Sequence, residues 1–221
     1  MLEDVKYIVF DLNGTIVCGR YPSYGTVLQK LGYKPKNASM TPFSNMKLQE
    51  IARGHGSLFQ VIERHYTGTS CSKNEFFEQM TSKLYLRKNA EEVLCRLNDA
   101  GKTLLLCSDT TGTAKKVVEK FELQEVFKKC FYSCDVGFLK HEKDFWQHLL
   151  TQFPVKPRQF LVIGDNPATD IHIPNKLGMY TVLIPSGVEV LGDDYTVRSS
   201  DSLHEKPDFT IDSLDDLLLL L

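Results

Sequence analysis

The stretch Val5-Lys6-Tyr7-Ile8-Val9-Phe10-Asp11-Leu12-Asn13-Gly14-Thr15 joins an apolar run to a carboxylate and a Gly-Thr turn. The run Lys6–Phe10 lacks polar alternation, as strands do when helices cover both faces of a parallel sheet. Asp11 follows the run directly, so a strand here ends in a carboxylate. Such a carboxylate at the mouth of a buried sheet is a candidate nucleophile.

The rest of the chain alternates between apolar runs and helical patterns. Further buried strands are predicted at Thr103–Cys107, Phe160–Ile163 and Tyr180–Ile184, with weaker candidates at Phe131–Tyr132 and Phe209–Ile211. Apolar residues at helical spacing separate them, in stripes that begin at Ala90, Ala114 and Phe145. This alternation predicts an α/β fold whose core is a Rossmann-like, doubly wound parallel sheet.

The segment from residue 17 to 86 has a different pattern. It shows no convincing strand, and its helical stripes are separated by turn signals such as Lys34-Pro35 and Gly54-His55-Gly56. We therefore expect an all-helical unit inserted after the first strand. The expected division is a core of residues 1–16 and 87–221 and a helical domain of residues 17–86.

The composition excludes several classes of protein. Of the 221 residues, 42% are hydrophobic and 24% charged, as in globular rather than disordered proteins. The formal net charge of −2 gives no electrostatic footprint for nucleic acid. No signal peptide is visible, and the run Leu217–Leu221 is far shorter than the roughly 20 apolar residues that span a membrane. We expect a cytoplasmic protein, monomeric or weakly dimeric, without membrane or nucleic-acid partners.

The thiols and imidazoles show no metal-binding spacing. The six cysteines form no C-x-x-C pair, and the six histidines form no H-x-x-x-H pair. Reduced thiols packed as small hydrophobic groups are the favoured interpretation. We assign none of these residues to a metal.

Polar side chains lie after several of the predicted strands. Ser108 follows the strand predicted to start at residue 103, and Asp165 follows the one predicted to start at residue 160, with Asp170 five residues later. Lys140 lies downstream of the weaker candidate near residue 131. In a right-handed doubly wound sheet these features meet at one edge, where ligands bind. Carboxylates beside a hydroxyl and an ammonium predict a site for Mg²⁺ and a phosphate group.

With these features the chain resembles the haloacid dehalogenase-like hydrolase superfamily. The resemblance lies in four motifs in the family's order: Asp11-Leu12-Asn13-Gly14-Thr15, Ser108, Lys140 and Gly164-Asp165-Asn166-Pro167-Ala168-Thr169-Asp170. The helical segment between the first two motifs resembles the cap of the subclass that carries its cap there. The resemblance covers nearly the whole chain and implies a Mg²⁺-dependent phosphatase that acts on a small phosphorylated metabolite.

The resemblance also implies roles for individual residues. Asp11 would attack phosphorus and form an aspartyl-phosphate. Ser108 and Lys140 would hold the phosphoryl oxygens, and together with Asp11 and Asn13 they form the expected catalytic set. The expected phosphate-binding set is Leu12, Asn13, Ser108, Asp109 and Lys140. Asp109 is an extra carboxylate in that set, which is unfavourable unless it points away or pairs with a cation.

The implied metal site combines carboxylates with one backbone carbonyl. Asp11, Asp165, Asp170 and the carbonyl oxygen of Asn13 would hold Mg²⁺, which prefers oxygen ligands. The ion would let Asp11 approach an anionic phosphate by neutralising charge. Thr15 would brace the loop rather than take part in the chemistry.

Asn13 departs from the family pattern, because family phosphatases usually carry Asp there as general acid and base. An amide can do neither, so a rate contribution of roughly 10²–10⁴-fold could be missing. The chain is then a slow phosphatase, an enzyme of different chemistry, or a catalytically silent phosphate- or metabolite-binding protein. An engineered substitution that traps an intermediate is a further alternative.

A haloacid dehalogenase is the less favoured enzymatic alternative. Those relatives need an Arg shortly after the first motif as part of a halide cradle, and Arg20 lies nearby. An Arg on the lead into a cap more often faces solvent or contacts substrate. We therefore rank phosphatase above dehalogenase.

Overall fold

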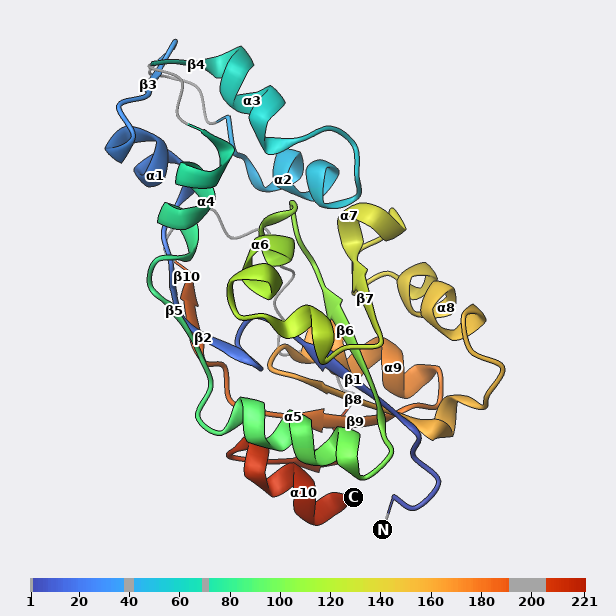
Figure 1. Cartoon of the computed structure of the whole chain (residues 1–221). Helices are drawn as coiled ribbons and strands as arrows, with labels where there is room; N and C mark the ends of the chain where they lie inside the picture. Colours follow the sequence, from blue (N-terminus) through green and yellow to red (C-terminus); the bar gives the residue numbers. More distant parts are fainter. Residues whose placement is uncertain (1, 38–41, 69–71, 191–205) are drawn as a thin grey trace.

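The sheet that positions the site draws its strands from both ends of the chain. The computed structural model describes residues 2–37, 42–68, 72–190 and 206–221. Within these residues, a six-stranded sheet has the order β11-β9-β8-β1-β6-β7, with neighbouring strands parallel (Figure 1). Its strands are β1 (Tyr7–Asp11), β6 (Thr103–Ser108), β7 (Lys129–Tyr132), β8 (Phe160–Gly164), β9 (Tyr180–Leu183) and β11 (Phe209–Thr210). The predicted strands, including the two weaker candidates, are therefore confirmed.

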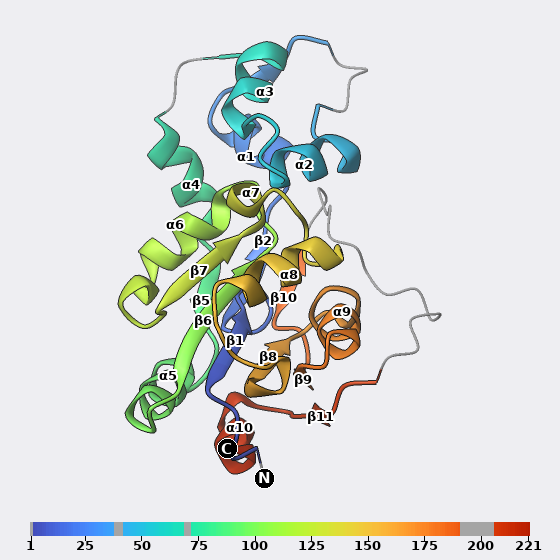
Figure 2. The same ribbon diagram turned by 90° about the vertical axis from the view of Figure 1, so that its right-hand side faces the viewer.

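Successive residues of β1 alternate between two hydrophobic clusters. Ile8 and Phe10 belong to one cluster, and Val9 belongs to the other. The helices that contribute to the first cluster are α5 (Ala90–Asp99), α6 (Thr113–Lys120) and α10 (Leu217–Leu220), and those of the second are α8 (Lys143–Thr151) and α9 (His172–Lys176). Helices thus cover both faces of the sheet (Figures 1 and 2). This confirms the doubly wound arrangement and explains why the strands lack polar alternation.

Shorter helical turns connect these elements. They are α7 (Ser133–Val136), the 3₁₀ turns Leu123–Glu125, Pro157–Gln159 and Leu214–Asp216, and a π-helical turn at Pro167–Ile171.

The inserted segment packs around a hydrophobic cluster of its own. Its helices are α1 (Tyr24–Lys30), α2 (Asn45–Ala52), α3 (Leu58–His65) and α4 (Lys73–Thr81). Each helix follows a serine whose hydroxyl accepts a hydrogen bond from the backbone N–H three residues later, at Ser23, Ser44, Ser57 and Ser72. The cluster includes the buried side chains of Leu28, Leu48, Ile51 and Phe76. Because this cluster is separate from those of the sheet, the segment is held together largely by its own packing.

The inserted segment also contains short strands, so the expectation of helices alone is wrong. β2 (Val17–Tyr21), at the start of the segment, pairs antiparallel with β5 (Leu84–Leu86), at its end. β2 also pairs in parallel with β10 (Val188–Val190). A second pair joins β3 (Lys34–Pro35) to β4 (Tyr66–Thr67). Such short strands show no clear hydrophobic period in the sequence. They form because the fold brings distant segments side by side.

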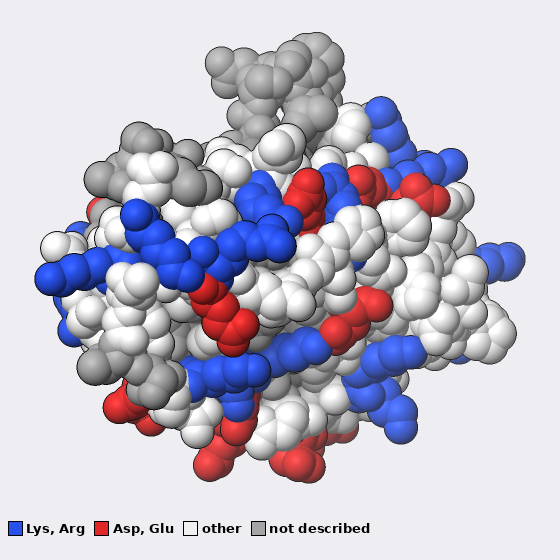
Figure 3. All heavy atoms as spheres, turned by 90° about the horizontal axis from the view of Figure 1, so that it is seen from above, with Lys and Arg blue, Asp and Glu red and all other residues white. Residues whose placement is uncertain are grey.

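The surface above the inserted segment carries charges of both signs (Figure 3). Acidic and basic side chains are interspersed on the face seen from the side of the inserted segment (Figure 3). Within the described ranges, every helix is too short or too polar to cross a lipid bilayer. The described cysteines are free thiols, while Cys71 and His204 lie outside the described residues.

Candidate active site

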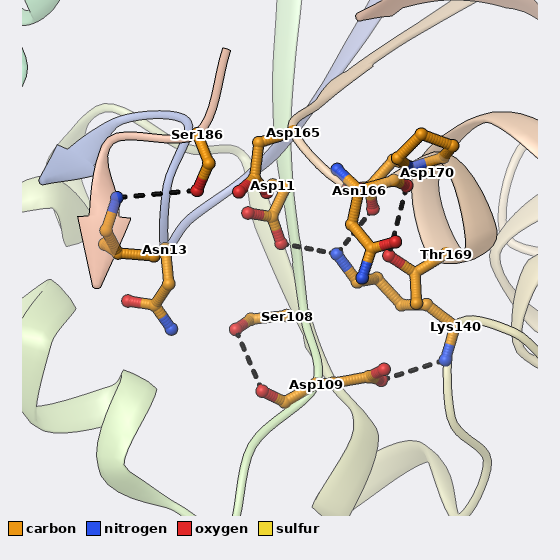
Figure 4. A pocket seen from close by; sticks show the side chains of 12 residues that line it. Asp11, Asn13, Ser108, Asp109, Lys140, Asp165, Asn166, Thr169, Asp170 and Ser186 are labelled. Carbon is orange, nitrogen blue, oxygen red and sulfur yellow. Dashed lines mark hydrogen bonds and ion pairs between the residues drawn. The ribbon is translucent and has the colours of Figure 1, made fainter. Parts of the chain in front are cut away.

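The predicted strand-end residues meet in one pocket. Asp11 ends β1, Ser108 ends β6, and Asp165 follows β8. Since these strands are parallel neighbours, their carboxyl ends bring the three side chains together. The pocket has a volume of about 260 Å³ and is lined by Asp11, Asn13, Ser108, Asp109, Lys140, Asp165, Asn166, Pro167, Thr169, Asp170, Ser186 and Val188 (Figure 4).

Three carboxylates of the pocket form a candidate metal site. Asp11, Asp165 and Asp170 each offer an oxygen, and these oxygens lie within 4.8 Å of one another. Burial raises the pKa of Asp11 and of Asp165, and the neighbouring carboxylates add to the rise while Lys140 opposes it. A divalent cation would relieve this repulsion, and hard carboxylate oxygens are what Mg²⁺ prefers. The residues present therefore fit Mg²⁺, whereas the Asn13 carbonyl as a ligand stays a prediction.

Lys140 supplies a buried positive charge. Its Nζ donates hydrogen bonds to Oδ1 of Asp11 and, at 2.7 Å, to Oδ1 of Asp170. Burial works to lower the pKa of Lys140, but the facing carboxylates raise the pKa overall, so the ammonium stays charged. Its backbone carbonyl accepts a hydrogen bond of 2.6 Å from Nε1 of the buried Trp146. Lys140 is thus a fixed cation placed against the candidate nucleophile.

Two glycines allow the carboxylates to approach the loops of the site. A Cβ atom at Gly14, whose φ is +96°, would collide with the carboxylate of Asp165. A Cβ atom at Gly164 would collide with Asp170. Any larger residue at either position would displace a carboxylate of the candidate metal site.

The turn after β1 is braced from two sides. The Arg87 guanidinium donates to the carbonyl oxygens of Gly14, Thr15 and Pro185, the last two at 2.6 and 2.7 Å. The hydroxyl of Thr15 donates to Oδ2 of Asp11 at 3.4 Å. These contacts keep the turn in place beside the nucleophile candidate.

Asn13 is held by the segment that enters the insertion. The hydroxyl of Tyr21, on β2, donates to Oδ1 of Asn13 at 2.5 Å. Burial, followed by the influence of Tyr24 and Asp11, raises the pKa of Tyr21, so the phenol keeps its proton. The hydroxyl of Tyr24, on α1, lies 2.9 Å from that of Thr111 on the core. Two tyrosines of the inserted segment therefore contact the loops that follow β1 and β6.

Ser108 and Asp109 lie side by side at the end of β6. Ser108 is buried, and its hydroxyl donates to the Asp109 carbonyl at 3.4 Å. The Asp109 carboxylate accepts a 2.8 Å hydrogen bond from the backbone N–H of Lys140. Burial raises the pKa of Asp109 to about 6, against the opposing effect of Lys140. The extra carboxylate is thus directed at a backbone donor, and its raised pKa reflects the cost of a buried charge.

The side chains of Leu12 and Arg20 both lie outside the pocket lining. The Leu12 side chain is fully buried in the cluster beneath α5 and α6 and does not line the pocket, so the assignment of Leu12 to the phosphate-binding set stays a prediction for its backbone alone. Adjacent residues at a strand end point in opposite directions, and the one beside Asp11 therefore faces the core. The guanidinium of Arg20 donates to Glu189 on β10 at 2.7 and 3.0 Å and also lies outside the pocket lining.

Several residues of the site were missed by sequence reasoning. Ser186 lines the pocket two residues after the run predicted at Tyr180–Ile184, so the strand-end rule applied to that run would have found it. Tyr21, Arg87 and Trp146 had no such signal, because their contacts join parts of the chain that are distant in sequence.

The family of the chain is indicated by two family models. The haloacid dehalogenase-like hydrolase model matches residues 5–173, and a related HAD-hydrolase-like model matches residues 138–217. A human glycerol-3-phosphate phosphatase is 36% identical over 70 residues, which cover 30% of this chain and 22% of that protein. The matched part is therefore a minor portion of that relative.

Solved structures support the same fold at low identity. A HAD phosphatase from Thermococcus onnurineus superposes with a TM-score of 0.63 at 17% identity, covering 98% of this chain and 97% of the other. A predicted phosphoglycolate phosphatase from Haemophilus somnus gives 0.62 at 19% identity, with 98% of each chain covered. A HAD family enzyme from Bacteroides thetaiotaomicron, in complex with magnesium and inorganic phosphate, gives 0.66 at 18% identity, covering 84% of this chain and 96% of the other.

Proposed function

The chain belongs to the haloacid dehalogenase-like hydrolases, and on this premise we propose that it is a Mg²⁺-dependent phosphatase that acts through an aspartyl-phosphate. The observation that carries the proposal is the pocket in which Asp11, Asp165 and Asp170 lie close together and Lys140 pairs with Asp11 and Asp170, beside the hydroxyl of Ser108. Carboxylates alone would repel a phosphate. With Lys140 and a bound cation, the same residues attract it.

The proposed chemistry uses the buried carboxylate of Asp11 as the nucleophile. Its oxygen attacks phosphorus, and the substrate's bridging oxygen leaves. Lys140 and Ser108 hold the phosphoryl oxygens while charge develops on them. Mg²⁺, when bound by Asp11, Asp165 and Asp170, supplies charge neutralisation. Water then releases phosphate and regenerates Asp11.

The substrate is a small phosphorylated metabolite in this proposal. A pocket of about 260 Å³ lies just below the usual range for ligand sites. In this proposal the inserted segment, residues 17–86, is a cap that lies over the pocket, and the rest of the chain is the core. Closure excludes water and selects the substrate, and the contacts of Tyr21 with Asn13 and of Tyr24 with Thr111 support this role.

Asn13 favours one second candidate, a catalytically silent phosphate- or metabolite-binding protein. An amide cannot protonate a leaving group or deprotonate water. The dehalogenase alternative has less support, because Arg20 is engaged by Glu189 rather than directed into the pocket.

The test is release of inorganic phosphate from a panel of phosphate esters and anhydrides, with Mg²⁺ and with chelator. We expect Mg²⁺-dependent release that falls roughly 10⁴-fold or more in Asp11→Asn, because the nucleophile is lost. Asp135→Asn is the matched control, since Asp135 is exposed, pairs with Lys115 and lies outside the pocket lining. No release by the native chain together with clear activity in Asn13→Asp would favour the silent binder instead.

A further inference from the structure

The Asn13 amide has a defined orientation in the pocket. An amide presents an oxygen acceptor on one side and two N–H donors on the other. The Tyr21 hydroxyl donates to the oxygen at 2.5 Å, so the acceptor is occupied on the side of the inserted segment. In Figure 4 the amide nitrogen lies on the Ser108 side of the side chain. Asn13 therefore presents hydrogen-bond donors to the site, but no acidic proton that it could transfer to a leaving group.

We propose that Tyr21 is a positioning residue that holds Asn13 as a neutral hydrogen-bond donor, and that the enzyme acts on phosphate compounds whose leaving group departs as a stable anion, acyl phosphates above all. This inference rests on the proposed phosphatase function. It adds a substrate class that neither the pocket volume nor the family match provides.

The first chemical step needs no proton when the leaving group is a carboxylate. The bond from the Asp11 oxygen to phosphorus forms, the bond from phosphorus to the acyl oxygen breaks, and the electron pair leaves with the carboxylate. A carboxylic acid has a pKa of about 4, so its anion is stable in water. An alcohol has a pKa near that of water, about 15.7, and its anion requires a proton that Asn13 cannot give.

The Asn13 donors still assist the leaving group. A hydrogen bond from Nδ2 to the bridging oxygen stabilises the negative charge that develops there. That stabilisation depends on the amide being turned the right way before the reaction starts, which is what the Tyr21 contact provides. In the second step, the oxygen of water forms a bond to phosphorus, the bond from phosphorus to the Asp11 oxygen breaks, and both protons of the water leave with the phosphate as H2PO4⁻, because the amide cannot take one.

The experiment measures kcat/KM for four substrates of falling leaving-group acidity: acetyl phosphate, p-nitrophenyl phosphate, phenyl phosphate and ethyl phosphate. Asp11→Asn serves as the blank for spontaneous hydrolysis. We expect acetyl phosphate to be preferred over ethyl phosphate by at least about 10²-fold. Asn13→Asp is expected to raise the ethyl phosphate rate by about 10²-fold or more while changing the acetyl phosphate rate far less.

A double-mutant cycle tests whether Tyr21 acts through Asn13. We expect Tyr21→Phe, which keeps the ring, to lower kcat for acetyl phosphate several-fold with little change in KM. In the Asn13→Ala background the same substitution is expected to have no further effect. Tyr24→Phe is the matched control, because it removes a hydroxyl that contacts Thr111 rather than Asn13. Its effect should be the same in both backgrounds.

The outcomes separate the two proposals. Equal rates across the series, with turnover that requires Asp11, would overturn the inference and leave the phosphatase intact. A Tyr21→Phe effect that persists unchanged in Asn13→Ala would overturn the positioning role. Absence of Asp11-dependent turnover for all four substrates would overturn the phosphatase itself.

Discussion

The ion pairs within the pocket and the ion pair that joins the inserted segment to the core differ in burial. The side chains of Lys140, Asp11 and Asp170 are 4%, 9% and 1% exposed. Arg53, just after α2, and Glu142, two residues beyond Lys140, make a forked contact at 3.0–3.3 Å with side chains 25% and 28% exposed. Both contacts involve the same loop of the core.

This difference in burial indicates that the ion pairs of the pocket are fixed, whereas the ion pair between Arg53 and Glu142 can open. A buried charge that loses its partner costs about 3–5 kcal/mol, whereas pairs near the surface contribute about 0–1 kcal/mol. The charges of the pocket are therefore in place before substrate arrives. The Arg53–Glu142 contact is weak enough to break and re-form as the proposed cap moves.

Removal of the buried cation should give the largest effect on stability. We expect Lys140→Met to lower the free energy of unfolding by about 3–5 kcal/mol at neutral pH in chelator, because Asp11 and Asp170 lose their partner. Denaturant unfolding measures this. Lys143→Met, at the start of the neighbouring helix α8, is a control that changes one charge without touching the carboxylates, and it should cost far less. If Lys140→Met lowered the free energy of unfolding by less than about 1 kcal/mol, the buried ion pairs of the pocket would be no stronger than a surface pair.

Magnesium should stabilise the core through the same carboxylates. At 100 times its dissociation constant, a ligand that binds only the folded state adds about 2.7 kcal/mol. We expect a corresponding rise in melting temperature for the native chain and a much smaller one for Asp165→Asn. Asp135→Asn should keep the full rise, since Asp135 is exposed and is not one of the residues that line the pocket. An equal rise in Asp165→Asn would remove Asp165 from the metal site.

Loss of the ion pair between Arg53 and Glu142 should give the smallest effect on stability. We expect a coupling free energy of about 1 kcal/mol or less between Arg53→Gln and Glu142→Gln, because both side chains are partly solvated. The cycle is needed because Glu142 also accepts a hydrogen bond from the backbone N–H of Leu139. A coupling free energy near that of a buried ion pair, about 3–5 kcal/mol, would show that the Arg53–Glu142 contact is as stable as the ion pairs of the pocket.

Much of the site could be predicted because its residues follow strands in the sequence. Asp11, Ser108 and Asp165 each come at the end of a buried apolar run, and a parallel sheet places such ends together. Leu12 shows the limit of this reasoning, since membership of a motif does not say which way a side chain points. The short strands β2, β5 and β10 show another limit, since their pairing partners are distant in the chain.

The sequence by itself determined the parallel α/β core, the carboxylates and lysine of the site, and the presence of an amide at residue 13. These are local properties: apolar periodicity, the order of strands and helices, and the chemistry of single residues. Only the tertiary structure decided that Tyr21 donates to Asn13, that Arg87 holds the turn after β1, and that Asp109 turns toward Lys140. Hydrogen bonds of this kind depend on distance and direction between residues far apart in the chain, which no local pattern records.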